Sequence, residues 1–264
     1  NVKLNLKLAE MEQVAQVHPF PSCGDESTAM GACYYEYIHN FGKKPQETQR
    51  VKGLYLGPEY TNQYVEEMIK RTDLRHRYMV EYYSDMEGTI AELLVKKKNV
   101  ARLAGKGEWG ARSLGNRAIL GNPSDRETFY KINNQIKMRD FWMPFAPTIL
   151  KEREADYIEN PKGIEAPYMI MAFHSTQRAQ TELVAAIHQA DKTCRPQVLE
   201  KGWNPAYYKI IKEFENETGI GGVLNTSFNL HGEPMVCAPE DAVHTMDNSG
   251  LEYLAIENYL ISRN

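Results

Sequence analysis

Residues 204–229 read NPAYYKIIKEFENETGIGGVLNTSFN, and this stretch decides the class of fold. Asn204 and Pro205 are a helix-start signal, and Gly219 is a stop signal after a run of apolar residues at helical spacing. The run GVLNTSF (222–228) then has the pattern of a buried strand that leads into a loop. Helices and strands alternate irregularly elsewhere, so the sequence predicts a mixed α/β (α+β) fold.

Hydrophobic periodicity and capping residues predict further elements on both sides of this stretch. Capping boxes at Ser84 and Glu87, and at Ser124 and Glu127, mark two helix starts. Helices are expected at 27–40, 61–71, 84–98, 124–136 and 239–250. Strands are expected at 99–104, 145–150, 167–173 and 252–261. The chain begins without Met and in a helix-like pattern, which indicates a chain cut inside a domain.

Composition argues against several classes of partner. The 264 residues carry a net charge of -4, which gives no global reason to expect nucleic acid or an anionic membrane. No apolar run approaches the ~18 residues of a membrane span, and no signal peptide is present. The four cysteines form no CxxC pair, as is typical of a reduced, cytoplasmic protein. Lys96–Arg139 nevertheless has eleven Lys or Arg against three acids, so it is either a solvated basic face or a local anion site.

Two sets of alternating polar residues are candidates for binding a charged ligand. Lys137 and Arg139 follow a predicted helix, and in an extended segment both would point toward one phosphate compound. Surface cations without a ligand are the alternative. Asn225, Ser227 and Asn229 follow the buried strand, where they either hold a carbonyl or ribose hydroxyl or serve as turn residues.

A glycine-rich loop supplies more positive charge. Arg112 and Arg117 lie among glycines that let backbone N–H groups approach an anion, although no P-loop motif is present. Trp109 in this loop either stacks on a base or fills the core. Arg195 lies farther along, and His188 with Asp191 is a weak metal signal because only two ligands are evident.

Four runs of the chain resemble the O-carbamoyltransferase family that includes nodulation and antibiotic-biosynthesis enzymes. They occur in the family's order and at roughly its spacing, and the resemblance covers nearly the whole chain. The runs are GEWGARSLGNRAILGNP (107–123), INNQIKMRDFWMPFAPTIL (132–150), ADKTCRPQ (190–197) and LNTSFNLHGEPMV (224–236).

This resemblance implies two parts. The family has an amino-terminal Kae1-like domain with an actin-like ATPase fold, followed by a YrdC/Sua5-like domain with a mixed twisted sheet and flanking helices. Residues 1–80 resemble the tail of the Kae1-like domain and a linker, which would account for the abrupt start. Residues 81–264 resemble a complete YrdC-like domain that forms carbamoyl adenylate.

The resemblance also implies an O-carbamoyltransferase that works in two steps. ATP and carbamoyl phosphate would form carbamoyl adenylate, and the carbamoyl group would pass to a hydroxyl of a sugar or natural product. The implied partners are these small molecules, without nucleic acid or membrane. ATP and Mg are the implied cofactors, with Fe or another divalent metal in the Kae1-like domain.

Site residues follow from the resemblance by motif. Lys137 and Arg139 match the family's KxR, and Ser227 and Asn229 its SxN. Arg112 matches the arginine of GPRALGNR, although alanine replaces the proline. The residues implied as catalytic are Lys137, Arg112, Arg195 and Ser227. The residues implied as substrate-binding are Arg139, Arg117, Asn225, Asn229 and Trp109.

Two positions leave questions open. Asp25 matches a metal-binding aspartate of the first domain, whose histidine partners would lie upstream of residue 1. Met143 stands where relatives have a substrate-contacting arginine, so another cation such as Arg117 compensates, the substrates differ, or the enzyme is weaker. A threonylcarbamoyl-adenylate synthase of tRNA modification and a non-catalytic nucleotide-binding or carbamoyl-phosphate-binding module are the alternative functions.

Overall fold

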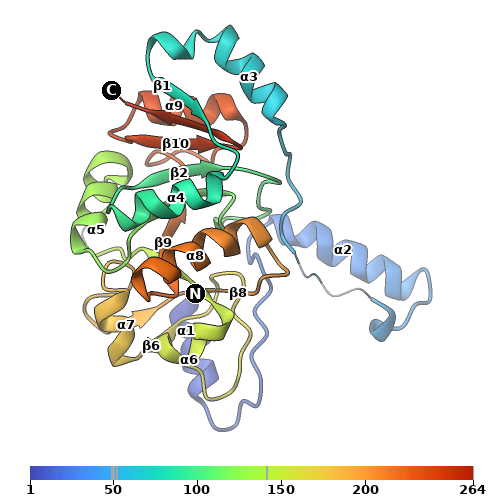
Figure 1. The fold of residues 1–264 in the computed structure, drawn as a ribbon. Coiled ribbons are helices and arrows are strands. Elements are labelled where there is room, and N and C mark those ends of the chain that lie inside the picture. Colours follow the sequence, from blue (N-terminus) through green and yellow to red (C-terminus); the bar gives the residue numbers. More distant parts are fainter. Residues whose placement is uncertain (49–50, 52, 141, 264) are drawn as a thin grey trace.

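An eight-stranded mixed sheet forms the frame of the protein (Figure 1), seen in a computed structural model that describes residues 1–48, 51, 53–140 and 142–263. Its order is β1-β11-β10-β2-β3-β9-β4-β8, with parallel pairing only for β10 with β2 and β4 with β8. The strands are β1 (Met79–Tyr82), β2 (Val100–Leu103), β3 (Arg117–Gly121), β4 (Ala146–Leu150), β8 (Gln197–Leu199), β9 (Gly222–Ser227), β10 (Tyr253–Ile256) and β11 (Tyr259–Ser262). The predicted mixed sheet with flanking helices is confirmed.

Shorter elements complete the molecule. A small second sheet has the order β5-β6-β7, formed by β5 (Ile158–Glu159), β6 (Phe173–Ser175) and β7 (Thr193–Cys194). The α-helices are α1 (Val2–Glu10), α2 (Glu26–His39), α3 (Asn62–Arg71), α4 (Met86–Val95), α5 (Arg126–Ile132), α6 (Glu154–Tyr157), α7 (Gln177–Glu182), α8 (Pro205–Thr218) and α9 (Pro239–Asp247). Short 3-10 helices are η1 (Pro45–Glu47), η2 (Leu74–His76) and η4 (Lys151–Arg153), and η3 (Asn133–Lys137) is a π-helix.

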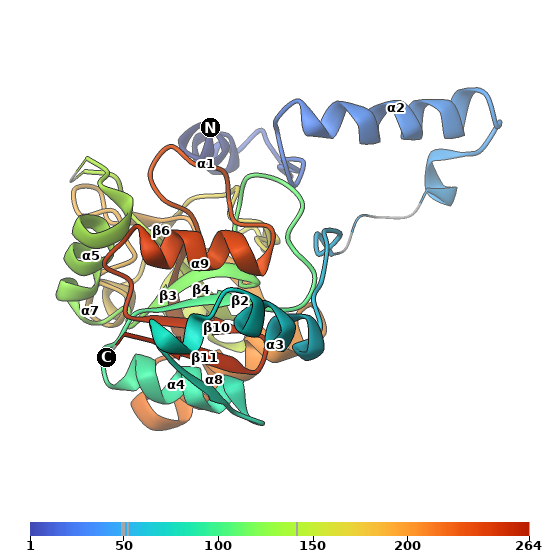
Figure 2. The ribbon, with the colours of Figure 1, turned by 90° about the horizontal axis from the view of Figure 1, so that it is seen from above.

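Apolar side chains cover both faces of the large sheet. Alternation along β3 sends Ala118 and Leu120 to the face under α4 and α8, and Ile119 to the face under α3, α5 and α9. Figure 2 shows α9 on one side of the strands and α4 with α8 on the other. Burial on both faces fixes the register of the strands, because a slip by one residue would exchange the two faces.

Local signals predicted several elements well. Asn204 caps α8 by accepting a hydrogen bond from the Tyr207 N–H, and Gly219 ends the helix with φ 75°. The capping boxes at Ser84 and Ser124 are wrong by one residue, since Asp85 and Asp125 cap α4 and α5. In both segments an aspartate directly follows the serine, and its carboxylate is a strong hydrogen-bond acceptor. The spacing of residues alone did not show which of the two neighbouring side chains caps the helix.

Two predicted strands are wrong in extent. The segment 252–261 is not one strand but the hairpin of β10 and β11, whose turn places Glu257 at φ 48°. This turn was missed because Glu257-Asn258 contains no glycine. The segment 167–173 is irregular as far as Ala172 and joins β6 only at Phe173.

The residues on either side of the predicted boundary at residue 80 pack with the large sheet. That boundary falls inside β1, which pairs with β11 along its whole length. Val65, Met68 and Leu74 lie in the same apolar core as β10 and β11. Residues 62–80 therefore pack with the sheet, and the assignment of the preceding residues to another domain stays a prediction.

Helix α2 is arranged in a different way from the other long helices. It extends away from the sheet in both views (Figures 1 and 2), and none of its residues is buried. Across the described ranges, no helix has both the length and the apolar character to cross a membrane.

Candidate functional site

Three arginines that lie far apart in the sequence line one cavity, which we call the arginine cavity. Its volume is about 40 Å³. Arg112 comes from the loop before β3, Arg139 from the segment after η3, and Arg195 from the turn between β7 and β8. The other lining residues are Ala111, Ser113, Pro144, Phe145, Ala146, Met169, Asn225, Thr226 and Ser227. The cavity can hold a small group, such as a phosphoryl or carbamoyl group, but not a whole nucleotide.

Positive charge in the arginine cavity is not neutralised by the protein. No carboxylate is among the described lining residues. Burial and the positive charge of Arg112 lower the pKa of Arg139. Burial, with Arg112 and Arg139 nearby, lowers the pKa of Arg195 to about 9. Arg195 is still cationic at neutral pH, and the guanidinium groups repel one another until an anion lies between them.

Few contacts position two of these arginines, Arg139 and Arg195. The Arg195 guanidinium donates a hydrogen bond of 2.8 Å to the Met169 carbonyl. The Arg139 guanidinium carbon lies 6.0 Å from the centre of the Phe145 ring. The Arg139 N–H donates to Asn133 Oδ1 (3.0 Å), and Asn133 Nδ2 donates to the Arg139 carbonyl (2.9 Å). Most guanidinium donors therefore remain available for oxygen atoms of a ligand.

Lys137 lies beside the cavity and is fully buried. Its ammonium donates hydrogen bonds to the hydroxyl of Ser227 (3.2 Å), the carbonyl of Asn229 (3.1 Å), the Ser227 carbonyl and Asn229 Oδ1. The Ser227 hydroxyl also donates to Asn229 Oδ1 (2.7 Å). Burial, and then the charge of Arg139, lowers the pKa of Lys137 to about 7. Lysine, serine and asparagine thus form one network at the end of β9.

The backbone between Lys137 and Arg139 differs from the predicted extended segment. Lys137 ends the π-helix η3, and Met138 has φ 44°, in the left-handed region. This conformation is uncommon for a residue with a side chain, and π-helical turns often occur at functional sites. The turn leaves Met138 exposed while Lys137 is buried and Arg139 lines the cavity.

The Asn225 side chain links β9 and β4 of the sheet to the loop that contains Arg112. Its side-chain amide donates to the Ser113 carbonyl (3.2 Å) and to Thr148 Oγ1 (3.1 Å), and its Oδ1 accepts from the Ser113 hydroxyl (3.3 Å). Asn225 and Ser227 point to the same side of β9, as alternate residues of a strand do, and both line the cavity.

Arg117 and Trp109 lie elsewhere. The buried Arg117 guanidinium donates to the backbone carbonyls of Pro58, Ala104, Gly105, Asn116 and Cys237. Those contacts stabilise the loop, and Arg117 does not line the arginine cavity. Trp109 packs with Phe20, whose ring centre is 6.4 Å away, in a smaller core cluster with Leu54.

Glu108 organises the same loop and was not identified from the sequence. One oxygen of its buried carboxylate accepts hydrogen bonds from the N–H groups of Leu114 (2.7 Å), Asn116 (2.8 Å) and Arg117 (3.2 Å). A carboxylate followed by main-chain donors six to nine residues later has no recognised sequence signature. The contact fixes the turn that contains Arg112.

Comparison with known proteins decides the family of this chain. The model of the family described as Carbamoyltransferase C-terminus matches residues 91–263. The chain belongs to this carbamoyltransferase family. All residues that line the arginine cavity lie within the matched range.

Relatives are similar along the whole chain. Protein MJ1058 of Methanocaldococcus jannaschii is 35% identical over 264 residues, covering 100% of this chain and 43% of its own length. The nodulation protein NolO of Bradyrhizobium diazoefficiens is 29% identical over 264 residues, covering 100% of this chain and 47% of its own length. The chain thus spans less than half the length of either relative. Full-length HypF in the phosphate- and nucleotide-bound form aligns with 71% of this chain and 22% of its own at a TM-score of 0.48 and 17% identity.

Metal ligands do not gather in the described part of this chain. Asp25 is exposed at the start of α2, and no group of three or more His, Cys, Asp or Glu side chains forms there or elsewhere in that part. His188 Nδ1 lies 3.1 Å from Asp191 Oδ1, and Asp191 also pairs with Lys3. The residues described do not by themselves form a site for the implied metal.

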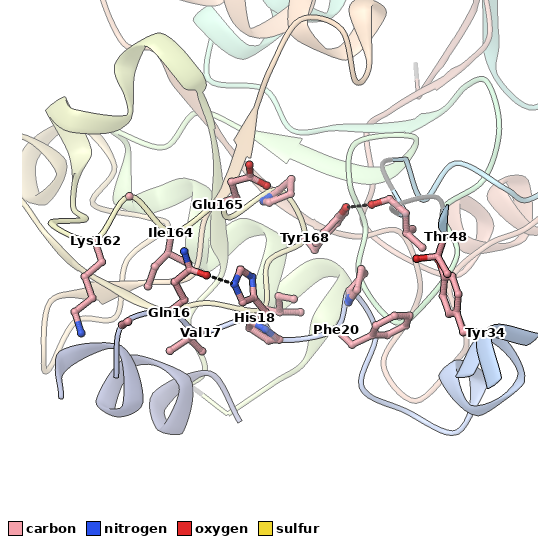
Figure 3. A pocket seen from close by; sticks show the side chains of 17 residues that line it. Gln16, Val17, His18, Phe20, Tyr34, Thr48, Lys162, Ile164, Glu165 and Tyr168 are labelled. Atoms are coloured by element: carbon pink, nitrogen blue, oxygen red, sulfur yellow. Dashed lines mark hydrogen bonds between the residues drawn. The ribbon is translucent and has the colours of Figure 1, made fainter. Parts of the chain in front are cut away.

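A second, larger cavity is lined in part by Tyr168 and Ile170 (Figure 3). It has a volume of about 570 Å³ and lies between residues 15–21 and 162–170. Tyr168 and Ile170 line it, whereas Met169 between them lines the arginine cavity. One short segment of backbone, with Met169 at φ 56°, therefore separates the two cavities.

Proposed function

We propose that this chain carries the carbamoyl-activating part of an O-carbamoyltransferase. In this proposal ATP and carbamoyl phosphate give carbamoyl adenylate, with the reacting carbamoyl and phosphoryl groups in the arginine cavity. Water first hydrolyses carbamoyl phosphate to carbamate and phosphate. An oxygen of carbamate then attacks the α-phosphorus of ATP and expels pyrophosphate.

The unpaired charge of the arginine cavity is the observation that carries the proposal. Arg112, Arg139 and Arg195 face a space without carboxylates, so an anion of small size would offset their mutual repulsion. Guanidinium groups bind phosphate oxygens by paired hydrogen bonds and stabilise charge that develops on the transferring phosphorus. A buried cluster of like charges is costly in a protein with no use for an anion.

The proposed roles of the remaining site residues follow from their contacts. Lys137 would neutralise a phosphate oxygen at the edge of the cavity, where its hydrogen bonds to Ser227 and Asn229 hold it. Ser227 would orient the carbamoyl group, since its hydroxyl lies at the cavity wall. Asn225 would act by holding the loop that carries Arg112. No role in binding substrate is proposed for Arg117 or Trp109.

Transfer to an acceptor is proposed to need more than this chain. The acceptor's hydroxyl oxygen would attack the carbamoyl carbon and expel AMP. Because the chain spans under half of its relatives, we expect it to activate carbamoyl phosphate without carbamoylating an acceptor.

Pyrophosphate release tests the proposed function. The protein is incubated with ATP and carbamoyl phosphate, with ATP, threonine and bicarbonate, or with ATP alone. Release that depends on carbamoyl phosphate is expected. Release that depends on threonine would indicate a threonylcarbamoyl-adenylate synthase, and no release in any mixture would indicate a binding module.

A further inference from the structure

Helix α1 contacts both of the backbone segments that place Arg195 in the arginine cavity. The Arg195 guanidinium donates a hydrogen bond of 2.8 Å to the Met169 carbonyl, so its position depends on two pieces of the chain. One is the turn between β7 and β8, which carries Arg195 itself. The other is the segment 168–170, which carries the carbonyl. Polar side chains near the start of α1 reach each of them.

Lys3 holds the first of these segments. Its ammonium pairs with Asp191 and donates a hydrogen bond of 2.6 Å to the Thr193 hydroxyl. The Asp191 carboxylate also accepts from the N–H (3.0 Å) and the hydroxyl (2.7 Å) of Thr193, which lies two residues before Arg195. Lysine, aspartate and threonine thus form one network that joins α1 to the start of β7.

Asn5 holds the second segment. Its side-chain amide donates a hydrogen bond of 2.8 Å to the carbonyl of Ile170, the residue after Met169. Met169 has φ 56°, in the left-handed region, which is uncommon for a residue with a side chain. Such a conformation persists where the surrounding contacts hold it. The Asn5 contact is therefore placed to keep the Met169 carbonyl turned toward Arg195.

Other contacts fix the opposite end of α1. Ala9 packs with Phe173 and Cys194 in one apolar cluster. Glu10 Oε1 lies 2.8 Å from His174 Nε2. The carboxyl end of the helix is thus held on β6 and β7 without the help of Lys3 or Asn5, so a substitution at the amino end should leave α1 in place.

We propose that Lys3 and Asn5 are positioning residues for Arg195 and that they raise the affinity of the arginine cavity for an oxyanion. This inference rests on the proposed function, which supplies the oxyanion. Neither side chain lines the cavity, so Lys3 acts through the turn before β8 and Asn5 through the Met169 carbonyl. The predicted boundary at residue 80 places α1 and Arg195 in different domains, and the cavity would then be completed across that boundary.

NMR titration of the whole chain with inorganic phosphate, a method that also follows weak binding, tests the role of Asn5. Asn5→Ala removes the hydrogen-bond donor without changing the charge. The dissociation constant should rise roughly two- to tenfold, the range that corresponds to one lost hydrogen bond. Alanine favours a helix more than asparagine does, so α1 itself should persist.

The role of Lys3 is tested in the same titration. Lys3→Met should raise the dissociation constant by a similar factor, and Lys3→Arg, which keeps a cationic donor, should restore most of the affinity. Lys7→Ala is the matched control, because it removes a lysine from the same helix but breaks only a contact within α1, that with Glu10. An equal loss of affinity in Lys7→Ala would overturn the role of Lys3, since net charge alone would then explain it.

A second series in an Arg195→Ala background separates positioning from a general weakening of the site. If Asn5 acts through Arg195, adding Asn5→Ala should leave the affinity of Arg195→Ala unchanged. An equal loss in both backgrounds, or unchanged affinity in both Asn5→Ala and Lys3→Met, would overturn the proposal. If Arg195→Ala binds no phosphate, the comparison of Asn5→Ala with Lys7→Ala and the rescue by Lys3→Arg still decide the result.

The outcomes also separate this inference from the proposed function. A chain that binds phosphate but releases no pyrophosphate from ATP and carbamoyl phosphate would overturn the proposed function and leave the positioning role intact. Unchanged phosphate affinity in the α1 variants, with normal pyrophosphate release, would overturn the positioning role alone. Failure of the unaltered chain to bind phosphate would overturn both.

Discussion

At the scale of single residues, the arginine cavity depends on charges that have few protein partners. Arg195 contacts one carbonyl, and Arg139 faces the ring of Phe145. A side chain held in this way loses little when the ligand arrives, because no ion pair has to break first. Arg117 does not replace the charge of Arg139 or Arg195 if either is lost, because the Arg117 guanidinium donates to backbone carbonyls.

Arg195→Ala should slow adenylate formation a hundredfold or more. The guanidinium would stabilise charge on the transferring phosphate, and removal of one such donor costs about 3 kcal/mol of transition-state stabilisation. Pyrophosphate release with carbamoyl phosphate measures the effect. Arg178→Ala is the control, because Arg178 pairs with Glu182 on the surface of α7. Near-normal release in Arg195→Ala would contradict the role given to this residue.

The pKa of Lys137 gives the site a pH dependence. Burial and Arg139 lower that pKa to about 7, so the free chain loses the ammonium charge above neutrality. The protonated form binds anions better, and a phosphoryl ester keeps its full charge above pH ~7. Affinity for carbamoyl phosphate should therefore fall as the pH rises from 7, with proton uptake on binding, measured by calorimetry in buffers of different ionisation enthalpy.

The Lys137→Met variant and the pH dependence of folding stability test the direction of the pKa shift of Lys137. Lys137→Met should bind more weakly and lose this pH dependence. Between pH 7 and ~10 the unfolded chain holds the Lys137 proton and the folded chain does not, so Lys137 contributes stability that increases with pH in that window. A binding constant that is flat from pH 7 to 9 in the unaltered chain would contradict the shifted pKa.

The sequence indicated which residues could form the site but not how they meet. Alternation along a buried strand correctly placed Asn225 and Ser227 on one side of β9. The same reasoning failed for Lys137 and Arg139, because the π-helix and the left-handed Met138 are not local preferences of that sequence. Glu108 was missed for a similar reason, since its partners are main-chain N–H groups.

At the scale of elements, the loop between β2 and β3 is held in position by helix α8. Gly115 in this loop has φ 110°, and its backbone lies against the ring of Tyr207 in the first turn of α8. Asn204, the cap of α8, also donates a hydrogen bond of 2.8 Å to Asn116 Oδ1. The loop that carries Arg112 thus has its shape set by a helix that begins 90 residues later in the chain.

Gly115→Ala should destabilise the fold by roughly 2–4 kcal/mol. A Cβ at this position would overlap the buried Tyr207 ring, and the backbone conformation is unfavourable for any residue with a side chain. Gly232→Ala is the control, with φ 80° but no neighbouring atom within 4 Å, so it carries only the conformational cost. Urea unfolding measures both, and equal losses would show that the contact with Tyr207 is not limiting.

Elements whose ends carry signals in their own sequence were predicted, and the turn that divides β10 from β11 was not. Helix α8 had a cap, a first-turn proline and a glycine stop within its own sequence. The hairpin of β10 and β11 had no glycine to mark its turn, and its second strand is defined by pairing with β1. Pairing with a strand some 180 residues away leaves no periodic signal in either segment.

At the scale of the whole molecule, the order of strands brings the site together. β9 lies between β3 and β4 and is antiparallel to both. Its carboxyl end therefore lies next to the loop before β3 and the segment before β4, and these parts line the cavity. Arg195 lies just before β8, the parallel neighbour of β4. The resemblance of separate motifs to one family therefore has a simple physical basis, because neighbouring strands carry those motifs to one cavity.

The large apolar core includes residues from Val65 onward, and this predicts which shortened chains fold. A chain that starts at Gly53 keeps α3 and β1 and should unfold cooperatively. A chain that starts at Ser84 loses six core residues and leaves β11 as an open edge. The six are Val65, Met68, Ile69, Leu74, Tyr78 and Val80. Their burial contributes on the order of 10 kcal/mol, comparable with the entire stability of a typical domain, so this chain should not fold. Thermal unfolding followed by near-ultraviolet circular dichroism distinguishes the two. A chain from Ser84 that melts as cooperatively as the chain from Gly53 would contradict this expectation and support the predicted boundary near residue 80.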